Sequence, residues 1–276
     1  MKRILFPTDF SETANNAFVH ALQFANTVKG ELVLLHSYDL LPMDDQFFPE
    51  NFAAVYDTVE LSHFELFKEE IPKLRKIMEE IGLDAIQINH RLMEGKLADN
   101  IQKCIVEENI DYLIMGTTSA TDWETLFSGS NSGAVVTGLK VPMLCVPLDL
   151  KYKKLKTIGF VTNYRPEDKT ALHKMIELAK RINAKVKCLY IGHGNAGHTQ
   201  VEVDRWESEF KAEPVQFMGI RSEAIKQVTL DFIKVETIDV LAVLTYKKTD
   251  FEEQFVANYS KNKAADITVP LLVFHA

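Results

Sequence analysis

The sequence has few cysteines, no long apolar run and no excess of basic residues. Cys104, Cys145 and Cys188 are far apart and form no CxxC pair, which argues against a disulfide framework or a zinc knuckle. Each of them lies among apolar residues, so we expect reduced, packed thiols. No apolar run approaches the roughly 18 to 20 residues that a bilayer-spanning helix needs, so we expect no membrane partner.

The charge balance is acidic. With 31 basic and 39 acidic residues the formal net charge is -8, which disfavours a nucleic acid or an anionic lipid surface as partner. The chain opens with basic residues but only a short apolar stretch that ends at Pro7, unlike a secretory leader. We therefore expect a mature cytoplasmic protein.

The composition is that of a folded protein. Hydrophobic residues make up 46% and charged residues 25% of 276 residues, which is typical of a chain with a packed core. That length suits one large or two ordinary domains.

An internal repeat decides between these possibilities. Residues 110–113 read Ile-Asp-Tyr-Leu, and residues 238–241, 128 positions later, read Ile-Asp-Val-Leu. The segments VPMLCVPL (141–148) and VPLLVFHA (269–276) match at the same shift. Two separate matches at one shift indicate two copies of one domain.

Near the start of each copy the shift is 154. Four alternating residues match there: Ile4, Phe6, Thr8 and Phe10 with Ile158, Phe160, Thr162 and Tyr164. The two shifts differ by 26 residues, so the second copy has lost a segment between its second and fourth strands, at the position of residues 39–85. We place the first domain at 1–149 and the second at 155–276.

Within the first copy, short runs rich in Val, Ile and Leu alternate with helical patterns, which predicts a doubly wound α/β domain with a five-stranded parallel sheet. The expected strands are 3–7, 31–38, 86–92, 111–115 and 142–147. The expected helices are 11–28, with Ser11 as N-cap, then about 53–81, 96–108 and 130–139.

The last strand of each copy needs a partner. Pro142 and Pro147 bracket the first of them, which is typical of an edge strand, and an apolar edge must be paired or covered. We expect strands 142–147 and 270–275 to pair with each other and to make the chain an intramolecular pseudo-dimer. A homodimer and unidentified protein partners remain open.

Candidate binding residues follow two strand ends, where open parallel sheets bind ligands. The first strand ends in Pro7-Thr8-Asp9, whose carboxylate suits a ribose or an adenine amine, although Asp9 can equally orient the turn into the next helix. The fourth strand ends at Met115-Gly116, and Gly129-Ser130-Asn131 open the last helix, where free N–H groups favour a phosphate or serve as an ordinary N-cap.

These residues resemble the universal stress protein family over the whole first half. The resemblance lies in ILFPTDFSETA (4–14), ELVLLHSYD (31–39), and the spacing of Gly116, Ser119 and Gly129-Ser130. Nucleotide-binding members have a glycine where this chain has Ser119. The resemblance implies an adenine nucleotide alpha hydrolase-like fold and, as ligand, ATP with magnesium or a related adenine nucleotide.

Site residues are also implied by this resemblance. Thr8 and Asp9 would lie by the ribose and adenine, and the backbone around Ser37 would meet the base. The phosphates would be held by Gly116, Ser119, Gly129, Ser130 and Asn131. His36 is expected to face a neighbouring helix.

The second copy has lost these residues. Leu244, Lys247, Ala257 and Asn258 stand at the positions of Gly116, Ser119, Gly129 and Ser130, and Asn163 stands at that of Asp9. The second copy is therefore expected to be structural or regulatory.

The leading hypothesis is a stress-response regulatory protein that binds an adenine nucleotide in its first domain without turnover. The sequence has no GxSxG, HExxH or Walker lysine loop, and we expect no catalytic or metal-ligating residues. One alternative is a scaffold or a binder of apolar ligands. Another is a slow ATPase in which Asp9 or Asp122 helps to hold magnesium.

Overall fold

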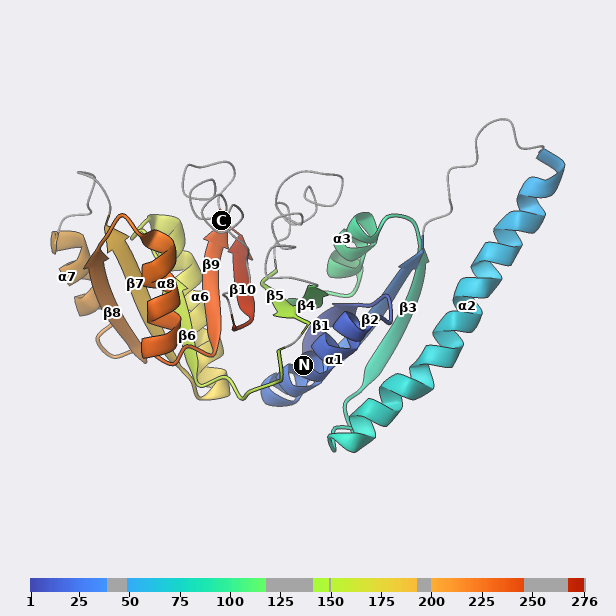
Figure 1. The fold of residues 1–276 in the computed structure, drawn as a ribbon, viewed down its shortest axis with the longest axis horizontal. Helices are drawn as coiled ribbons and strands as arrows, with labels where there is room; N and C mark the ends of the chain where they lie inside the picture. Colours follow the sequence, from blue (N-terminus) through green and yellow to red (C-terminus); the bar gives the residue numbers. More distant parts are fainter. Residues whose placement is uncertain (39–48, 118–140, 149, 193–199, 246–267, 276) are drawn as a thin grey trace. The chain divides into compact units, whose positions relative to one another are not determined.

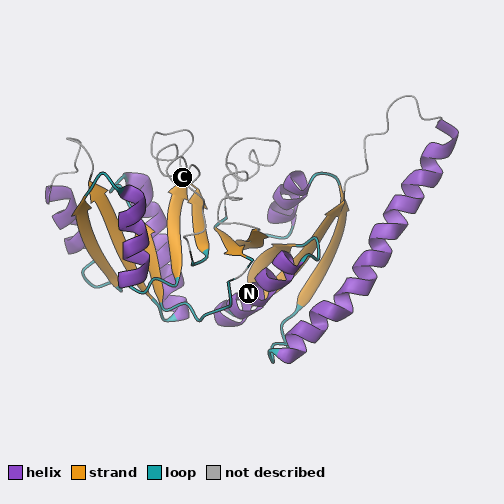
Figure 2. Cartoon of the chain, viewed as in Figure 1, coloured by secondary structure: helices purple, strands orange, loops and turns teal. Residues whose placement is uncertain are grey.

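The computed structural model describes residues 1–38, 49–117, 141–148, 150–192, 200–245 and 268–275. They form two compact units, Met1–Gly116 and Thr117–Ala276. Each unit is an α/β arrangement of a mostly parallel sheet with helices along its faces, as the sequence predicts (Figures 1 and 2).

The first unit has four parallel strands in the order β3-β2-β1-β4. The strands are β1 (Lys2–Pro7), β2 (Gly30–Tyr38), β3 (Ile88–Glu94) and β4 (Tyr112–Thr117). The helices are α1 (Glu12–Val28), α2 (Pro49–Glu80) and α3 (Leu97–Glu107). Helix α1 packs on β1, β2 and α2, and α3 packs on β1 and β2. The direction of winding reverses between β1 and β4, which makes this the doubly wound switch point.

The second unit repeats this order with five parallel strands, β10-β9-β6-β7-β8. The strands are β6 (Thr157–Val161), β7 (Lys185–Gly192), β8 (Val215–Arg221), β9 (Val240–Thr245) and β10 (Leu271–His275). The helices are α6 (Pro166–Ile182), α7 (Gln200–Glu209) and α8 (Ile225–Val235). In Figure 1, α8 lies in front of this sheet and α6 behind it.

Strand β5 (Met143–Pro147) pairs antiparallel with β10, with Leu144 opposite Leu272. The compact units divide after Gly116, so β5 is grouped with the second unit, because it pairs with that unit's last strand. The boundary at residue 149 rests on the sequence repeat and stays a prediction.

Equivalent hydrogen bonds recur in both units. The N–H of Thr8 donates to the carbonyl of Leu35, and that of Thr162 donates to the carbonyl of Leu189, both at 2.9 Å. At the other end of the sheet, the carboxylates of Asp111 and Asp239 accept from the N–H of Arg3 and Thr157, again both at 2.9 Å. The sequence shifts therefore align equivalent backbone positions.

The segment shortened in the second copy is the helix between the second and third strands. Helix α2 has 32 residues, whereas α7 has 10. Most predicted elements agree with the structure to within two residues, but α2 begins at Pro49 instead of about 53. The third strand begins at Ile88 instead of 86. Residues 81–87 form turns after α2, in which the N–H of Ile86 donates to the carbonyl of Leu83. The expected helix 130–139 lies outside the described residues.

The three cysteines are free and buried, as predicted. Burial raises the pKa of the Cys145 thiol to about 12 and also raises the pKa of Cys104 and Cys188. A thiol that stays protonated is a poor nucleophile and metal ligand, so these side chains act as packing groups.

Candidate functional site

The carboxyl ends of β1, β2 and β4 lie next to one another in the first unit. Strand β1 is the central strand, with Pro7 level with Leu35 of β2. On its other side Leu5 is level with Leu113 of β4, and continuing this register puts Met115 and Gly116 level with Pro7 and Thr8. The structure thus brings together the described residues that the sequence proposed for the site.

The turn from β1 into α1 is held by its own side chains. The Oγ1 of Thr8 accepts a hydrogen bond from the N–H of Phe10 at 2.9 Å, and Oδ1 of Asp9 accepts from the N–H of Ser11 at 3.0 Å. Phe10 has a φ of 63°, a left-handed conformation that costs an aromatic residue free energy. These bonds offset that cost and fix the direction of the turn.

Asp9 therefore orients the turn, which is the structural alternative considered for it from sequence. Its side chain is nevertheless exposed, and its second oxygen, Oδ2, has no hydrogen-bond partner among the described residues. A carboxylate has several acceptor positions, so one oxygen can hold the turn while the other accepts from a ligand. Ser11 caps α1 as predicted, accepting from the N–H of Ala14 at 3.2 Å.

Ser37 contributes its backbone. Its hydroxyl accepts a hydrogen bond from Nδ2 of Asn100 at 3.0 Å, so the side chain is engaged with α3. Backbone groups alternate in direction along a strand: the carbonyl of Leu35 faces β1, whereas that of Tyr38 faces β3 and accepts from Gly95. The N–H and C=O of Ser37 therefore face the space beyond the end of β1.

Gly116 is required by close packing. A Cβ atom at this position would lie 2.7 Å from the carbonyl oxygen of Thr13 and 2.9 Å from its methyl group. The glycine lets the end of β4 approach the first turn of α1, whose N-terminal N–H groups point toward the same edge of the sheet.

His36 is buried, 5% exposed, at the end of β2. Its Nδ1 lies 2.8 Å from the carbonyl oxygen of Thr8, and its Nε2 lies 3.4 Å from Nδ1 of His63 on α2. The expectation that His36 faces a helix is confirmed. Sequence reasoning missed His63 and His90, because no spacing rule links three histidines on two strands and a helix.

Two of these histidines have perturbed pKa values. Burial, and secondarily the nearby His36, lower the pKa of His63. Burial, and secondarily the positive charge of Arg75, lower the pKa of His90. Both rings therefore resist protonation in the folded protein.

Most residues expected to hold the phosphates belong to the segment 118–140, which is not among the described residues. Ser119, Gly129, Ser130 and Asn131 lie outside the described residues, as does Asp122 of the ATPase alternative. The second-copy residues Lys247, Ala257 and Asn258 are also outside them. Their roles stay predictions.

In the second unit the same turn is closed by a buried carboxylate. Tyr164 repeats the left-handed conformation of Phe10, with a φ of 56°, and its N–H donates to Oγ1 of Thr162 at 3.0 Å. Asp168, 2% exposed, accepts at Oδ2 from the Thr162 hydroxyl and from the N–H groups of Asn163 and Arg165, at 3.0, 2.7 and 3.2 Å. Burial raises the pKa of Asp168 despite these bonds.

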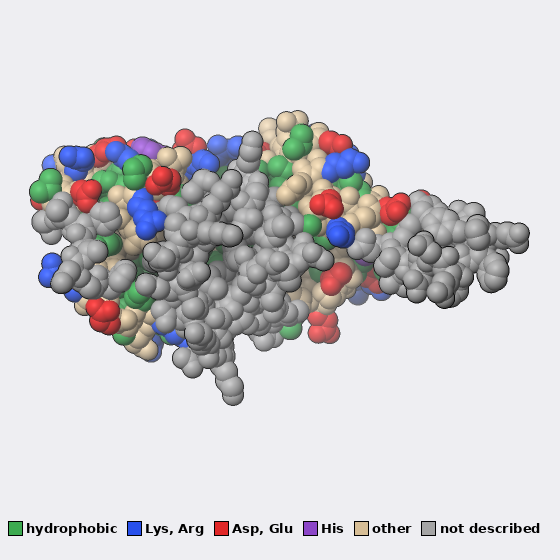
Figure 3. Space-filling model, turned by 90° about the horizontal axis from the view of Figure 1, so that it is seen from above, with side chains coloured by type: hydrophobic (Ala, Val, Ile, Leu, Met, Phe, Trp, Pro, Cys, Tyr) green, Lys and Arg blue, Asp and Glu red, His purple; other side chains and the backbone are tan. Residues whose placement is uncertain are grey.

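We also searched the described residues for membrane-spanning helices, metal sites and clusters of basic side chains. None of their helices is long and apolar enough to cross a membrane, and they contain no group of three or more His, Cys, Asp or Glu side chains that could hold a metal ion. Among the described residues on the face drawn in Figure 3, basic and acidic side chains are interspersed. A polyanion site would need clustered basic residues.

Residues 1–147 match the universal stress protein family. The match covers more than half of the chain, and the chain therefore belongs to that family. The chain is 28% identical over 149 residues to Universal stress protein MJ0531 of Methanocaldococcus jannaschii, covering 52% of this chain and 81% of that protein. It is 29% identical over 155 residues to Universal stress protein MJ0577 of the same organism, covering 52% of this chain and 94% of that protein.

A solved structure shares the fold of the whole chain. The crystal structure of a universal stress protein from Archaeoglobus fulgidus superposes with a TM-score of 0.74 at 17% identity, covering 99% of this chain and 98% of that one. This likeness extends the agreement in fold to the second half.

Proposed function

We propose that the first unit binds an adenine nucleotide at the carboxyl ends of β1, β2 and β4, and that the second unit does not. The observation that carries the proposal is the meeting of Asp9, the Ser37 backbone and Gly116 at the switch point of the sheet. Open α/β sheets bind ligands at that point.

The described residues suit the nucleoside part of the ligand. The unpartnered Oδ2 of Asp9 accepts from ribose hydroxyls or the adenine amine, and the N–H and C=O of Ser37 supply one donor and one acceptor to the base. Gly116 and four predicted residues would bind the phosphates, with magnesium if the ligand is ATP. The predicted residues are Ser119, Gly129, Ser130 and Asn131.

Three changes argue against a nucleotide in the second unit. Asn163 replaces the carboxylate of Asp9. Leu244, 5% exposed, stands at the position of Gly116 and adds a side chain where the first unit has none. The buried Asp168 accepts from backbone N–H groups of the turn, which removes donors from an incoming ligand.

We further propose that the nucleotide acts as a ligand without turnover. We also propose that the two copies of the domain form an intramolecular pseudo-dimer through their last strands, β5 and β10. Their antiparallel pairing supports the second part of this proposal. A ligand that binds only the folded state stabilises it by RT ln(1 + [L]/Kd), which is sufficient for a regulatory role.

The test is a calorimetric titration of the full chain with ATP and magnesium. We expect saturable binding that is lost in Gly129→Asp and weakened at least tenfold in Asp9→Ala, because a charged hydrogen-bond acceptor contributes about 1.5 to 3 kcal/mol. Asn163→Ala, at the equivalent position of the second unit, is the matched control and should bind normally. Absence of binding at millimolar ATP would refute the proposal, and phosphate release above background would refute the absence of turnover.

A further inference from the structure

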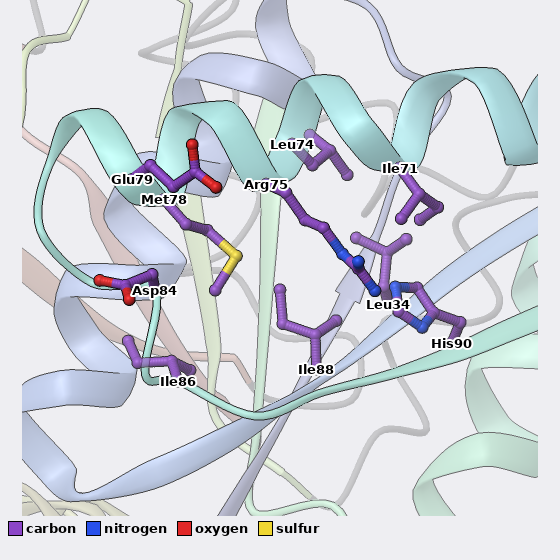
Figure 4. A pocket seen from close by; sticks show the side chains of 10 residues that line it. All are labelled: Leu34, Ile71, Leu74, Arg75, Met78, Glu79, Asp84, Ile86, Ile88 and His90. Atoms are coloured by element: carbon purple, nitrogen blue, oxygen red, sulfur yellow. The ribbon is translucent and has the colours of Figure 1, made fainter.

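A cavity of about 300 Å³ lies under α2 in the first unit, away from the strand ends of the nucleotide site (Figure 4). Helix α2 forms its roof, β2 and β3 form its floor, and the turn after α2 closes one end. Its volume is at the lower limit of pockets that bind small molecules, about 300 to 1,000 Å³.

Six of the ten residues that line the cavity are apolar. The apolar lining residues are Leu34, Ile71, Leu74, Met78, Ile86 and Ile88. Leu34, Leu74 and Met78 are 0%, 3% and 4% exposed, so this surface is held in place by the surrounding core. This apolar part of the wall offers water no hydrogen bonds, and an aliphatic group gains free energy by replacing water there.

One end of the cavity carries positive charge. Arg75 extends from α2 toward His90 on β3 (Figure 4), and its charge contributes to the lowered pKa of His90. Arg75 forms no ion pair with a carboxylate among the residues that the structure describes. The acidic lining residues Glu79 and Asp84 lie at the other end, near the turn.

The second unit shows how the same fold closes this space. His90 pairs with Leu34 across β2 and β3, and Phe217 pairs with Cys188 at the equivalent position of β7 and β8. Phe217 packs against Trp206 and Phe210, with ring centroids 6.4 and 6.2 Å apart. Aromatic side chains therefore occupy the position that His90 holds in the first unit.

We propose that the cavity under α2 binds a medium-chain aliphatic carboxylate, with its chain among the apolar residues and its carboxylate at Arg75 and His90. The planar guanidinium of Arg75 matches a carboxylate with two parallel hydrogen bonds. A methylene needs roughly the 30 Å³ of a water molecule, so a chain of about eight to ten carbons fits.

The test is a calorimetric titration of the full chain with decanoate below its micelle concentration, beside decanol as the uncharged probe. We expect one saturable decanoate per chain, bound about tenfold tighter than decanol. Arg75→Gln should abolish this preference. Lys76→Gln is the matched control, because Lys76 is the next residue on α2 and does not line the cavity.

A second variant tests the chain-binding part. Ile71→Phe adds volume at a half-buried position of the cavity wall and should abolish the binding of both probes. Bound decanoate should also raise the pKa of His90, measured by NMR, because a carboxylate beside the ring favours its protonated form. No saturable binding, or binding that Arg75→Gln and Ile71→Phe leave unchanged, would overturn the proposal.

The outcome is independent of the nucleotide proposal. Gly129→Asp, which should lose ATP, is expected to bind decanoate as the unaltered chain does. Loss of decanoate binding in that variant would contradict a separate site under α2.

Discussion

The imidazole of His36 donates from Nδ1 to the carbonyl oxygen of Thr8, 2.8 Å away, and joins the end of β2 to the turn that follows β1. A carbonyl only accepts, so Nδ1 carries the proton of this hydrogen bond, and Nε2 of the same ring lies 3.4 Å from Nδ1 of His63. This hydrogen bond positions the turn that carries Asp9.

The histidines predict how stability depends on pH. Burial and neighbouring positive charge lower the pKa of His63 and His90 in the folded chain below the ordinary value of 6.5. The unfolded chain therefore binds more protons than the folded chain just below pH 6.5, so the free energy of unfolding should fall as the pH drops through this range. Urea denaturation between pH 5.5 and 8 measures it.

The double variant His63→Gln/His90→Gln is the comparison that isolates these two side chains, because all other titrating groups are shared. Its free energy of unfolding should depend less steeply on pH below 6.5. If the free energy of unfolding depends equally on pH in the variant and in the unaltered chain, His63 and His90 are not the cause of the pH dependence.

Gly116→Ala should destabilise the first unit. The new methyl group would meet the carbonyl oxygen of Thr13 at 2.7 Å, so β4 or α1 must shift, at a cost of about 1 to 3 kcal/mol. Gly219→Ala is the control, because nothing lies within 4 Å of a Cβ at that position of β8. Denaturation midpoints that fall equally in both variants would show that close packing at Gly116 is not the cause.

Asp168→Ala should destabilise the second unit. Three donors lose their shared acceptor: the buried hydroxyl of Thr162 and the partly buried N–H groups of Asn163 and Arg165. A buried donor without a partner costs about 1 to 3 kcal/mol and a partly buried one costs less, so we expect a loss of about 3 kcal/mol in all. Glu167→Ala changes an exposed neighbour on the same helix and should have little effect. A loss below about 1 kcal/mol in Asp168→Ala would mean that this carboxylate does not hold the turn.

The sequence predicted much of the fold because periodicity and the repeat are local signals. The Ser11 cap, the α/β order and the shortened segment of the second copy all follow from residue patterns. The sequence predicts the start of β3 two residues early, because the turns after α2 contain apolar residues such as Ile86 that resemble the start of a strand.

Less of the site could be predicted, because its features depend on contacts between distant residues. The left-handed turn at Phe10 has an aromatic residue where glycine or asparagine would be expected, so no local signal marks it. The need for glycine at position 116 comes from Thr13, 103 positions earlier. The cavity under α2 depends on how one helix packs on two strands.

The most direct test of the central claim is the number of ATP molecules bound per chain, measured by equilibrium dialysis with radiolabelled ATP and magnesium. One molecule per chain, falling to none in Gly129→Asp and unchanged in Asn163→Ala, is the predicted result. Two molecules per chain would show that the second unit also binds nucleotide, and none would show that neither unit does; either result would contradict the account.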